Sequence, residues 1–599
     1  MQLAGHGATS YAYVDPEMIS SVEVEKGPNS TAGGAGVTGG SVTFRTLTAD
    51  DILTNSSQTW GGRINATTGT NAFDFNGSAA GAVRIGEDVE LVAAVGRKRL
   101  GDYKVGRDGT VDYDADGIAA YTTQDQWSWL AKATARPADG HELKLSWTGL
   151  TTDFATGSGS YIDTDEVTNH TVVADYAWTP DSTWIDLAAK AYYTRTAVDQ
   201  FRPARARYDA FQVDYAIDTV GATLQNTSRF ETSLAEIALT YGGEVFHDKT
   251  ATSATAEDPT DDPNLVWFGS NPVGERTVGS LFAQAEFAHG DWLKLVTGLR
   301  YDAYTISGAG KVRDSTLRSF DDFAFEDSDG HLSPTATLAV TPFDGVEIYG
   351  SYENGMRPVN IMEMMLGGSH IGMTTSAFLP NPFLEPELTE TFEIGANVTF
   401  DGLIREDDSL RLKAAIYHTT VDNYIALASG QFVTEAGNRT YGSAYFNSLN
   451  PVTINGLELE AAYDIGVAYL RGALTLNDAD YDTAYDALIG TIPGYEPVGT
   501  AMVYFPTPKT RVTLDAGVRL LDRALTLGTR LNFVEPHELN TPNDTYALLD
   551  VYGSYEVNEK LTLRFAVENV ADVAYVDAMG SALSAAPGRT ATFGLTARF

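Results

Sequence analysis

Hydrophobic and polar residues alternate one by one along most of the chain, which is the period of a β-strand with two different faces. Residues 142–150 alternate cleanly, and residues 561–568 place Leu, Leu, Phe and Val on one face and Thr, Arg, Ala and Glu on the other. The pattern predicts an all-β protein, but a soluble sandwich of two sheets gives the same alternation. The connections between the strands are therefore needed to choose an architecture.

The predicted strands have short links at one end and long loops at the other. Residues 549–557 and 561–567 are joined by Asn558-Glu559-Lys560, whereas other strands lead into loops rich in Asp, Gly, Ser and Pro, such as residues 256–263 and 478–497. Short turns on one side and long loops on the other indicate a transmembrane, antiparallel β-barrel of the outer-membrane type.

The end of the chain favours the same architecture. Residues 591–599 alternate, and the chain ends on Phe599. A terminal aromatic residue on an amphipathic strand fits the aromatic girdle of a membrane barrel, whereas most soluble proteins end in a frayed polar tail. At roughly 25 residues per strand and connection, the chain after residue 52 forms about 22 strands, and a barrel of that width needs a plug in its lumen.

The N-terminal residues have a different pattern. A short strand at residues 21–25 and a second strand at residues 41–45 flank a glycine-rich loop at residues 30–40. Two short strands make a small sheet element and not a complete domain. We therefore divide the chain into residues 1–52, which have a natural place inside the barrel, and residues 53–599, which form its wall.

Composition excludes several classes of function. The 40 basic and 80 acidic residues give a net charge of −40, and no basic stripe is present, so nucleic acid is not an expected partner. The absence of cysteine excludes disulfides, thiolate metal sites and cysteine nucleophiles. No uninterrupted apolar stretch of about 18 residues predicts a transmembrane helix. Neither a G-x-S-x-G elbow nor an H-E-x-x-H pair appears, so we do not expect an enzyme.

One stretch, residues 351–398, departs from the strand pattern. Alternating residues at both of its ends enclose a middle rich in Pro, Gly and Met, with a single histidine, His370. Long loops inside a compact framework are uncommon and are usually functional or disordered. This stretch is therefore the main candidate for a binding site.

Several segments resemble those of the TonB-dependent outer-membrane receptors. Residues 14–28, followed by residues 41–46, resemble the last part of the plug domain of these receptors. Residues 298–302, residues 568–575 and the terminal Phe599 resemble the signatures of their barrel. The resemblance covers essentially the whole chain. It implies localisation in the bacterial outer membrane, contact with outer-membrane lipid and, in the full-length form, the TonB–ExbB–ExbD system as energising partner.

The candidate loop is most similar to that of the haem receptors in this family. Met356-Arg357-Pro358 resembles their F-R-A-P box, with Met in place of Phe. A second segment resembles their N-P-N-L box, with Phe in place of the second Asn: Asn381-Pro382-Phe383-Leu384-Glu385-Pro386-Glu387. The resemblance therefore implies that the two boxes enclose a haem-binding loop.

In those receptors a histidine between the two boxes is an axial ligand of the haem iron, and here His370 lies between them. The sequence of the loop most resembles that of the haemophore-associated, HasR-type receptors. Those receptors pair the loop histidine with a second histidine on the plug, and His6 occupies a comparable place. Neutral imidazole is a good iron ligand. The resemblance implies haem as the transported ligand, no intrinsic cofactor, and a haemophore or haemoprotein as partner.

The chain departs from the family at its N-terminus. The family's plug is longer and is preceded by a TonB box and a signal peptide, so we expect either an N-terminally truncated sequence or a barrel with a plug remnant. A ferric-siderophore or other nutrient receptor, a passive pore and haem ligation by a loop tyrosine stay open as alternatives. The loop methionines either contact the porphyrin or pack the loop; they are Met362, Met364, Met365 and Met373.

Overall fold

The protein is described from a computed structural model. The structure describes residues 13–27, 34, 36–55, 57–109, 117–158, 161–204, 210–256, 272–313, 320–367, 376–434, 439–481, 495–502, 506–539, 544–578 and 585–599.

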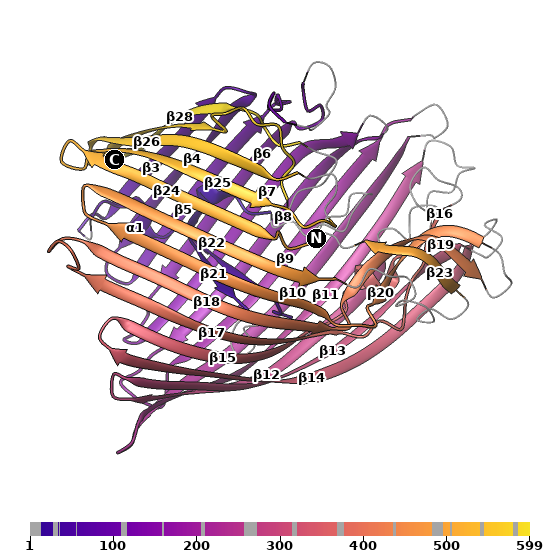
Figure 1. Cartoon of the computed structure of the whole chain (residues 1–599), viewed down its shortest axis with the longest axis horizontal. Coiled ribbons are helices and arrows are strands. Elements are labelled where there is room, and N and C mark those ends of the chain that lie inside the picture. Colours follow the sequence, from indigo (N-terminus) through magenta and orange to yellow (C-terminus); the bar gives the residue numbers. More distant parts are fainter. Residues whose placement is uncertain are drawn as a thin grey trace.

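Within these residues, 22 antiparallel strands close into a single barrel (Figure 1). The number of strands predicted from the chain length is therefore confirmed. In the order around the barrel, the strands are β3 (Trp60–Gly69), β4 (Phe73–Ile85), β5 (Val89–Leu100), β6 (Gln124–Ala135), β7 (His141–Ser158), β8 (Tyr161–Trp178), β9 (Leu187–Arg202), β10 (Phe211–Glu231), β11 (Glu236–Ala256), β12 (Val273–His289), β13 (Leu293–Arg313), β14 (Phe320–Phe343), β15 (Val346–Arg357), β17 (Glu387–Asp401), β18 (Ser409–Asp422), β21 (Val452–Asp464), β22 (Ala468–Asp480), β24 (Thr510–Leu520), β25 (Leu525–Glu535), β26 (Tyr546–Asn558), β27 (Leu561–Glu568) and β28 (Thr590–Arg598).

The last strand closes the barrel against the first strand of the wall. β28 pairs with β3 from Thr592↔Gly69 to Arg598↔Arg63. Phe599 continues this pairing, because its N–H donates to the Gly62 carbonyl at 3.1 Å and its carbonyl accepts from the Gly62 N–H at 3.0 Å. Closure pairs the backbone groups that an open edge strand would expose, which a structure that spans lipid requires.

The outer face of the wall is apolar. On β7, for example, Leu143, Leu145 and Trp147 alternate with polar residues and are exposed. Leu281 on β12 is also exposed. Exposed apolar side chains on alternate positions are those that face lipid in a membrane barrel. None of the helices in the described part of the chain is long and apolar enough to cross a membrane.

A small element lies inside this wall. It consists of η1 (Pro16–Met18), β1 (Ile19–Lys26), β2 (Gly40–Thr46) and α1 (Ala49–Ile52), and we call the described residues of 13–53 the lumenal segment. β1 and β2 pair antiparallel, as the two short strands predict. The interpretation of residues 1–52 as a remnant of a plug domain stays a prediction.

The lumenal segment touches two separate parts of the barrel. At one end, Met18, Leu47 and Ile52 are buried in a cluster with residues of β4, β5 and β6, such as Leu130. At the other end, the Lys26 ammonium pairs with Glu458 at 2.6 Å and Glu460 at 3.0 Å, both on β21. Because β4–β6 and β21 are far apart around the closed barrel, the segment crosses the lumen.

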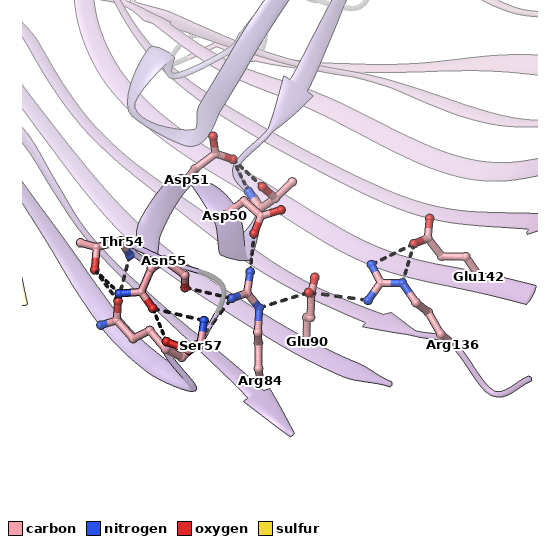
Figure 2. Close-up of polar contacts among 11 residues, drawn as sticks. Asp50, Asp51, Thr54, Asn55, Ser57, Arg84, Glu90, Arg136 and Glu142 are labelled. Carbon is pink, nitrogen blue, oxygen red and sulfur yellow. Dashed lines mark hydrogen bonds and ion pairs between the residues drawn. The ribbon is translucent and has the colours of Figure 1, made fainter. Parts of the chain in front are cut away.

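A chain of ion pairs holds α1 to the wall (Figure 2). Arg84 on β4 pairs with Asp50 of α1 and with Glu90 on β5. Glu90 also pairs with Arg136, which pairs in turn with Glu142 on β7 at 3.0 Å. The first turn of α1 is closed by Thr48 and Asp51 in a capping box. These polar contacts therefore hold α1 to the wall shortly before the chain enters β3.

A second, smaller sheet lies at the loop end of the barrel, at the right of Figure 1. It has four described strands, in the order β16 (Ser376–Phe378), β20 (Arg439–Asn447), β19 (Ile425–Thr434) and β23 (Tyr495–Met502). β16 runs parallel to β20, and the other pairs are antiparallel. The sequence predicts loops for β16 and for the start of β23 and makes no prediction for β19 and β20, so this sheet is a finding of the structure.

Candidate functional site

The candidate loop leaves the wall at the end of β15 and returns at the start of β17. After Arg357 the chain forms the short helix α3 (Ile361–Met365), and after β16 it enters β17 at Glu387. Arg357 and Glu387 are direct partners in the β15–β17 ladder. The two sequence boxes thus lie side by side where this loop leaves and re-enters the wall, and we call the described residues of 358–386 the box segment.

One guanidinium joins both boxes to the helix between them. The Nε atom of Arg357 donates to a Glu387 carboxylate oxygen at 2.7 Å, and its Nη1 atom lies 2.9 and 3.1 Å from the two carboxylate oxygens of Glu363 on α3. The second oxygen of Glu387 accepts from the N–H of Ile425 at 2.8 Å, which adds β19 to the group. We call Arg357, Glu363 and Glu387 the arginine node. Arginine suits such a site because its planar fork binds carboxylates in fixed directions.

Glu363 also caps the first turn of α3, together with Asn360. The Asn360 side-chain oxygen accepts from the Glu363 N–H at 2.9 Å, and the Glu363 carboxylate accepts from the Asn360 N–H at 3.0 Å, which makes a reciprocal capping box. Burial raises the pKa of the Glu363 carboxyl, although the neighbouring Arg357 guanidinium acts in the opposite direction. One guanidinium facing two carboxylates leaves an excess of negative charge, which a proton would relieve.

The second box is built around a buried amide. The side-chain oxygen of Asn381 accepts from the Phe383 N–H at 3.0 Å, and its NH2 group donates to the Tyr445 carbonyl at 2.9 Å. The Asn381 N–H also donates to the carbonyl of Met364 on α3 at 3.0 Å. Asn381 therefore ties the second box both to α3 and to β20.

The other residues of the boxes mostly pack. Pro358, Leu384 and Pro386 are buried, Pro382 is half-buried, and Phe383, which departs from the family pattern, is exposed. Met356, like Met364 and Met365, is fully buried in a cluster with residues of the wall and of the small sheet. Met362, Met364 and Met365 therefore pack within this cluster, and Met373 lies outside the described residues.

Two glycines of the wall make room for the helix. α3 packs on the inner side of β12 and β13, where Gly274 and Gly308 face Ile361 and Met365. A Cβ atom added at Gly308 would lie 3.0 Å from Cγ of Met365, which is tighter than ordinary contact. The box segment is thus fitted against the wall as well as bonded to it.

Both histidines predicted to bind iron, His370 and His6, lie outside the described residues. The structure therefore does not test them. What it does describe is the frame on both sides of His370, up to Gly367 and again from Ser376.

Other histidines have partners within the wall. His331 lies 2.7 Å from the side-chain oxygen of Asn354, and His418 lies 2.9 Å from that of Asn455. Glu363 is not among the site residues predicted from the sequence, although the spacing Asn360-x-x-Glu363 is a capping-box signal. The pairing of Glu387 with Arg357 and Ile425 depends on contacts between distant segments and has no local signal.

A barrel of 22 strands with a segment across its lumen is the architecture of outer-membrane transporters. A family model described as "TonB dependent receptor-like, beta-barrel" matches residues 130–570. The chain therefore belongs to the TonB-dependent receptors and is a protein of the bacterial outer membrane.

Curated relatives are receptors and transporters. A hemin receptor of Yersinia enterocolitica is 26% identical over 453 residues, covering 70% of this chain and 58% of that protein. The heme transporter BhuA of Brucella ovis is 23% identical over 618 residues, covering 98% of this chain and 81% of that protein. The chain thus spans less than two thirds of the length of the hemin receptor and more than two thirds of the length of BhuA.

Solved structures agree with the fold. The hemophore receptor HasR of Serratia marcescens, in a complex with its hemophore HasA and heme, has a TM-score of 0.82 and is 28% identical, covering 100% of this chain and 89% of that one. The FrpB iron transporter of Neisseria meningitidis has a TM-score of 0.74 at 18% identity, which supports the fold alone.

Proposed function

We propose that the chain is an outer-membrane receptor for haem, with haem as cargo and no resident cofactor. The observation that carries the proposal is the arginine node, in which Arg357 and Glu387 bring the two boxes together at the base of the segment that contains His370. A fixed base holds a ligand loop in one place. In the proposed site His370 provides one axial imidazole for the iron, and His6 provides the other.

Two further observations support this function. Relatives named as hemin or heme receptors match the chain, and the HasR complex contains a hemophore and heme.

The net charge of −40 does not attract an anionic porphyrin over long distances. Recognition must therefore depend on direct ligation and on delivery at short range, which fits a haemophore or haemoprotein as the partner that brings the ligand.

The function is recognition and transport without catalysis. Family membership supports the TonB–ExbB–ExbD system as the energising partner of the full-length receptor. In this proposal residues 1–52 are the last part of the plug and residues 53–599 are the barrel. Movement of the lumenal segment away from β21 would open a path through the lumen.

The direct test is ligand binding by the purified protein in detergent. Titration with haemin should give a saturable shift of its Soret band, and ferric siderophores should neither bind nor compete. Binding of a ferric siderophore with no Soret shift on addition of haemin would overturn the proposal in favour of a siderophore receptor. Energy-independent ion conductance in a reconstituted bilayer, again with no Soret shift, would identify a passive pore.

A further inference from the structure

Strand β14 extends farther toward the loop end of the barrel than its neighbour β15. β14 pairs with β13 along nearly its whole length, from Phe320↔Arg313 to Val340↔Leu293. It pairs with β15 only from Thr335↔Glu353 to Phe343↔Val346. On the β15 side of residues 320–334, no strand in the described part of the chain continues the ladder. In Figure 1, β13 and β14 continue toward the loop end, where the small sheet lies.

The reason for this step in the wall is the path of the box segment. After Arg357 the chain does not continue beside β14; α3 turns onto the inner side of β12 and β13. At the point of separation, His331 on β14 and Asn354 on β15 still share a side-chain hydrogen bond of 2.7 Å. Above it, the arginine node keeps β15 with β17, so the upper part of β14 is left as an edge.

Two residues show which backbone groups face the open side. Pro334 has no N–H, and proline is tolerated within a sheet where its nitrogen faces an edge. The N–H of Gly330 donates to the Asp329 side chain at 2.7 Å. Residues in an antiparallel strand face their two neighbours alternately, so the N–H groups of the even-numbered residues from 322 to 332 point away from β13.

The charge along the edge restricts what can pair with it. Residues 322–334 include Asp322, Glu326, Asp327 and Asp329 and contain neither Lys nor Arg. Like charges placed opposite each other destabilise a strand pair, and charged edges are a known protection against pairing of identical chains. A second copy of this edge or another acidic strand is therefore disfavoured. A strand with Lys or Arg at alternate positions is complementary.

We infer that residues 323–329 of β14 bind an extended, basic segment of the carrier protein by β-strand addition. In this mode main-chain hydrogen bonds supply affinity, and the alternate side chains supply specificity. The inference rests on the proposed function, because that function requires a partner that delivers the ligand. It places the carrier beside the box segment.

The test uses the full chain in detergent and a synthetic peptide of alternating Lys and Thr, with a twin in which Glu replaces Lys. Ser328→Pro removes one edge-facing N–H without removing a bond to β13, and Ser328→Thr keeps that N–H. The basic peptide should bind the wild type and Ser328→Thr alike, and Ser328→Pro should lower its affinity about tenfold. The acidic twin should not bind. Ala324→Pro, with Ala324→Val as control, repeats the comparison at a second position.

Amide hydrogen exchange shows where the peptide sits. The amides of Ala324, Glu326 and Ser328 should exchange quickly in the free protein and slowly with the basic peptide. Slow exchange in the free protein would overturn the inference, because the edge would already be paired. Binding that is equal in the proline and control variants would also overturn it. The haemin titration separates the two proposals, since Ser328→Pro should retain the wild-type Soret band.

Discussion

Two segments of this chain lie on the inner side of the barrel wall, and they are held in different ways. The lumenal segment reaches β21 through Lys26, which is 46% exposed, and its partners Glu458 and Glu460 are 17% and 49% exposed. The box segment is held by Arg357, which is 26% exposed, with Glu363 at 12% and Glu387 at 9%. One contact is open to solvent and the other is largely buried.

This difference has an energetic consequence. Exposed ion pairs contribute about 0–1 kcal/mol, whereas removal of one partner from a buried pair costs roughly 3–5 kcal/mol because a charge is left unpaired in the interior. The box segment is therefore a fixed frame. The β1–β2 end of the lumenal segment is loosely held, while its other end is anchored by the buried cluster on β4–β6.

Arg357→Ala should give the largest effect. It leaves Glu363 and Glu387 buried without their cation, so we expect the box segment to lose roughly 3–5 kcal/mol of local stability. Limited proteolysis should cut between β15 and β17 in the variant and spare the wild type. The barrel itself should keep its heat-modifiable migration on a gel. Arg411→Ala removes an exposed pair with Asp401 and is the matched control. Equal resistance of the Arg357 and Arg411 variants would contradict the account of the node.

Asn381→Ala should give an intermediate effect. The side chain is 1% exposed and makes two hydrogen bonds, to Phe383 N–H and to the Tyr445 carbonyl, so its loss should cost about 1–3 kcal/mol. The expected result is faster amide exchange at Phe383 and in α3. Gln212→Ala, at an exposed hydrogen bond to Asp214, should change these rates little. If the two variants exchange alike, the second box is not held by Asn381.

A smaller effect should follow pH. The pKa of Glu363 is raised above its usual value of 4.5, so the folded segment binds a proton more tightly than the unfolded chain does. Its contribution to stability is fully present below pH 4.5 and is lost as the pH rises through the raised pKa. Amide exchange of α3, corrected for the intrinsic pH dependence, should become faster over that range in the wild type and stay constant in Glu363→Gln. The same slope in both proteins would show that another group titrates.

Lys26→Ala should give the smallest effect on stability, about 0–1 kcal/mol, because the pairs with Glu458 and Glu460 are partly solvated. Its measurable consequence should be mobility of the β1–β2 end, seen as faster exchange of the β1 amides with no change around Met18. A loss of stability as large as that of Arg357→Ala would remove the contrast between the two segments.

Much of the fold could be predicted from the sequence, because strand alternation and connection length are local properties. The number of strands, the short and long connections and the two strands of the lumenal segment are of this kind. The small sheet could not be predicted in this way, since β16 and β20 join residues from two separate loops. The boxes were found by resemblance, and the role of Glu387 depends on a partner on a neighbouring strand.

The central claim, that the fixed box segment presents His370 to the haem iron, is tested most directly by the absorption spectrum of haemin bound to His370→Ala. The account predicts that the Soret maximum of bound haemin is shifted from its wild-type position in this variant and returns to it with added imidazole, while His289→Ala, a change at the exposed end of β12, keeps the wild-type spectrum. A wild-type spectrum in His370→Ala would contradict it.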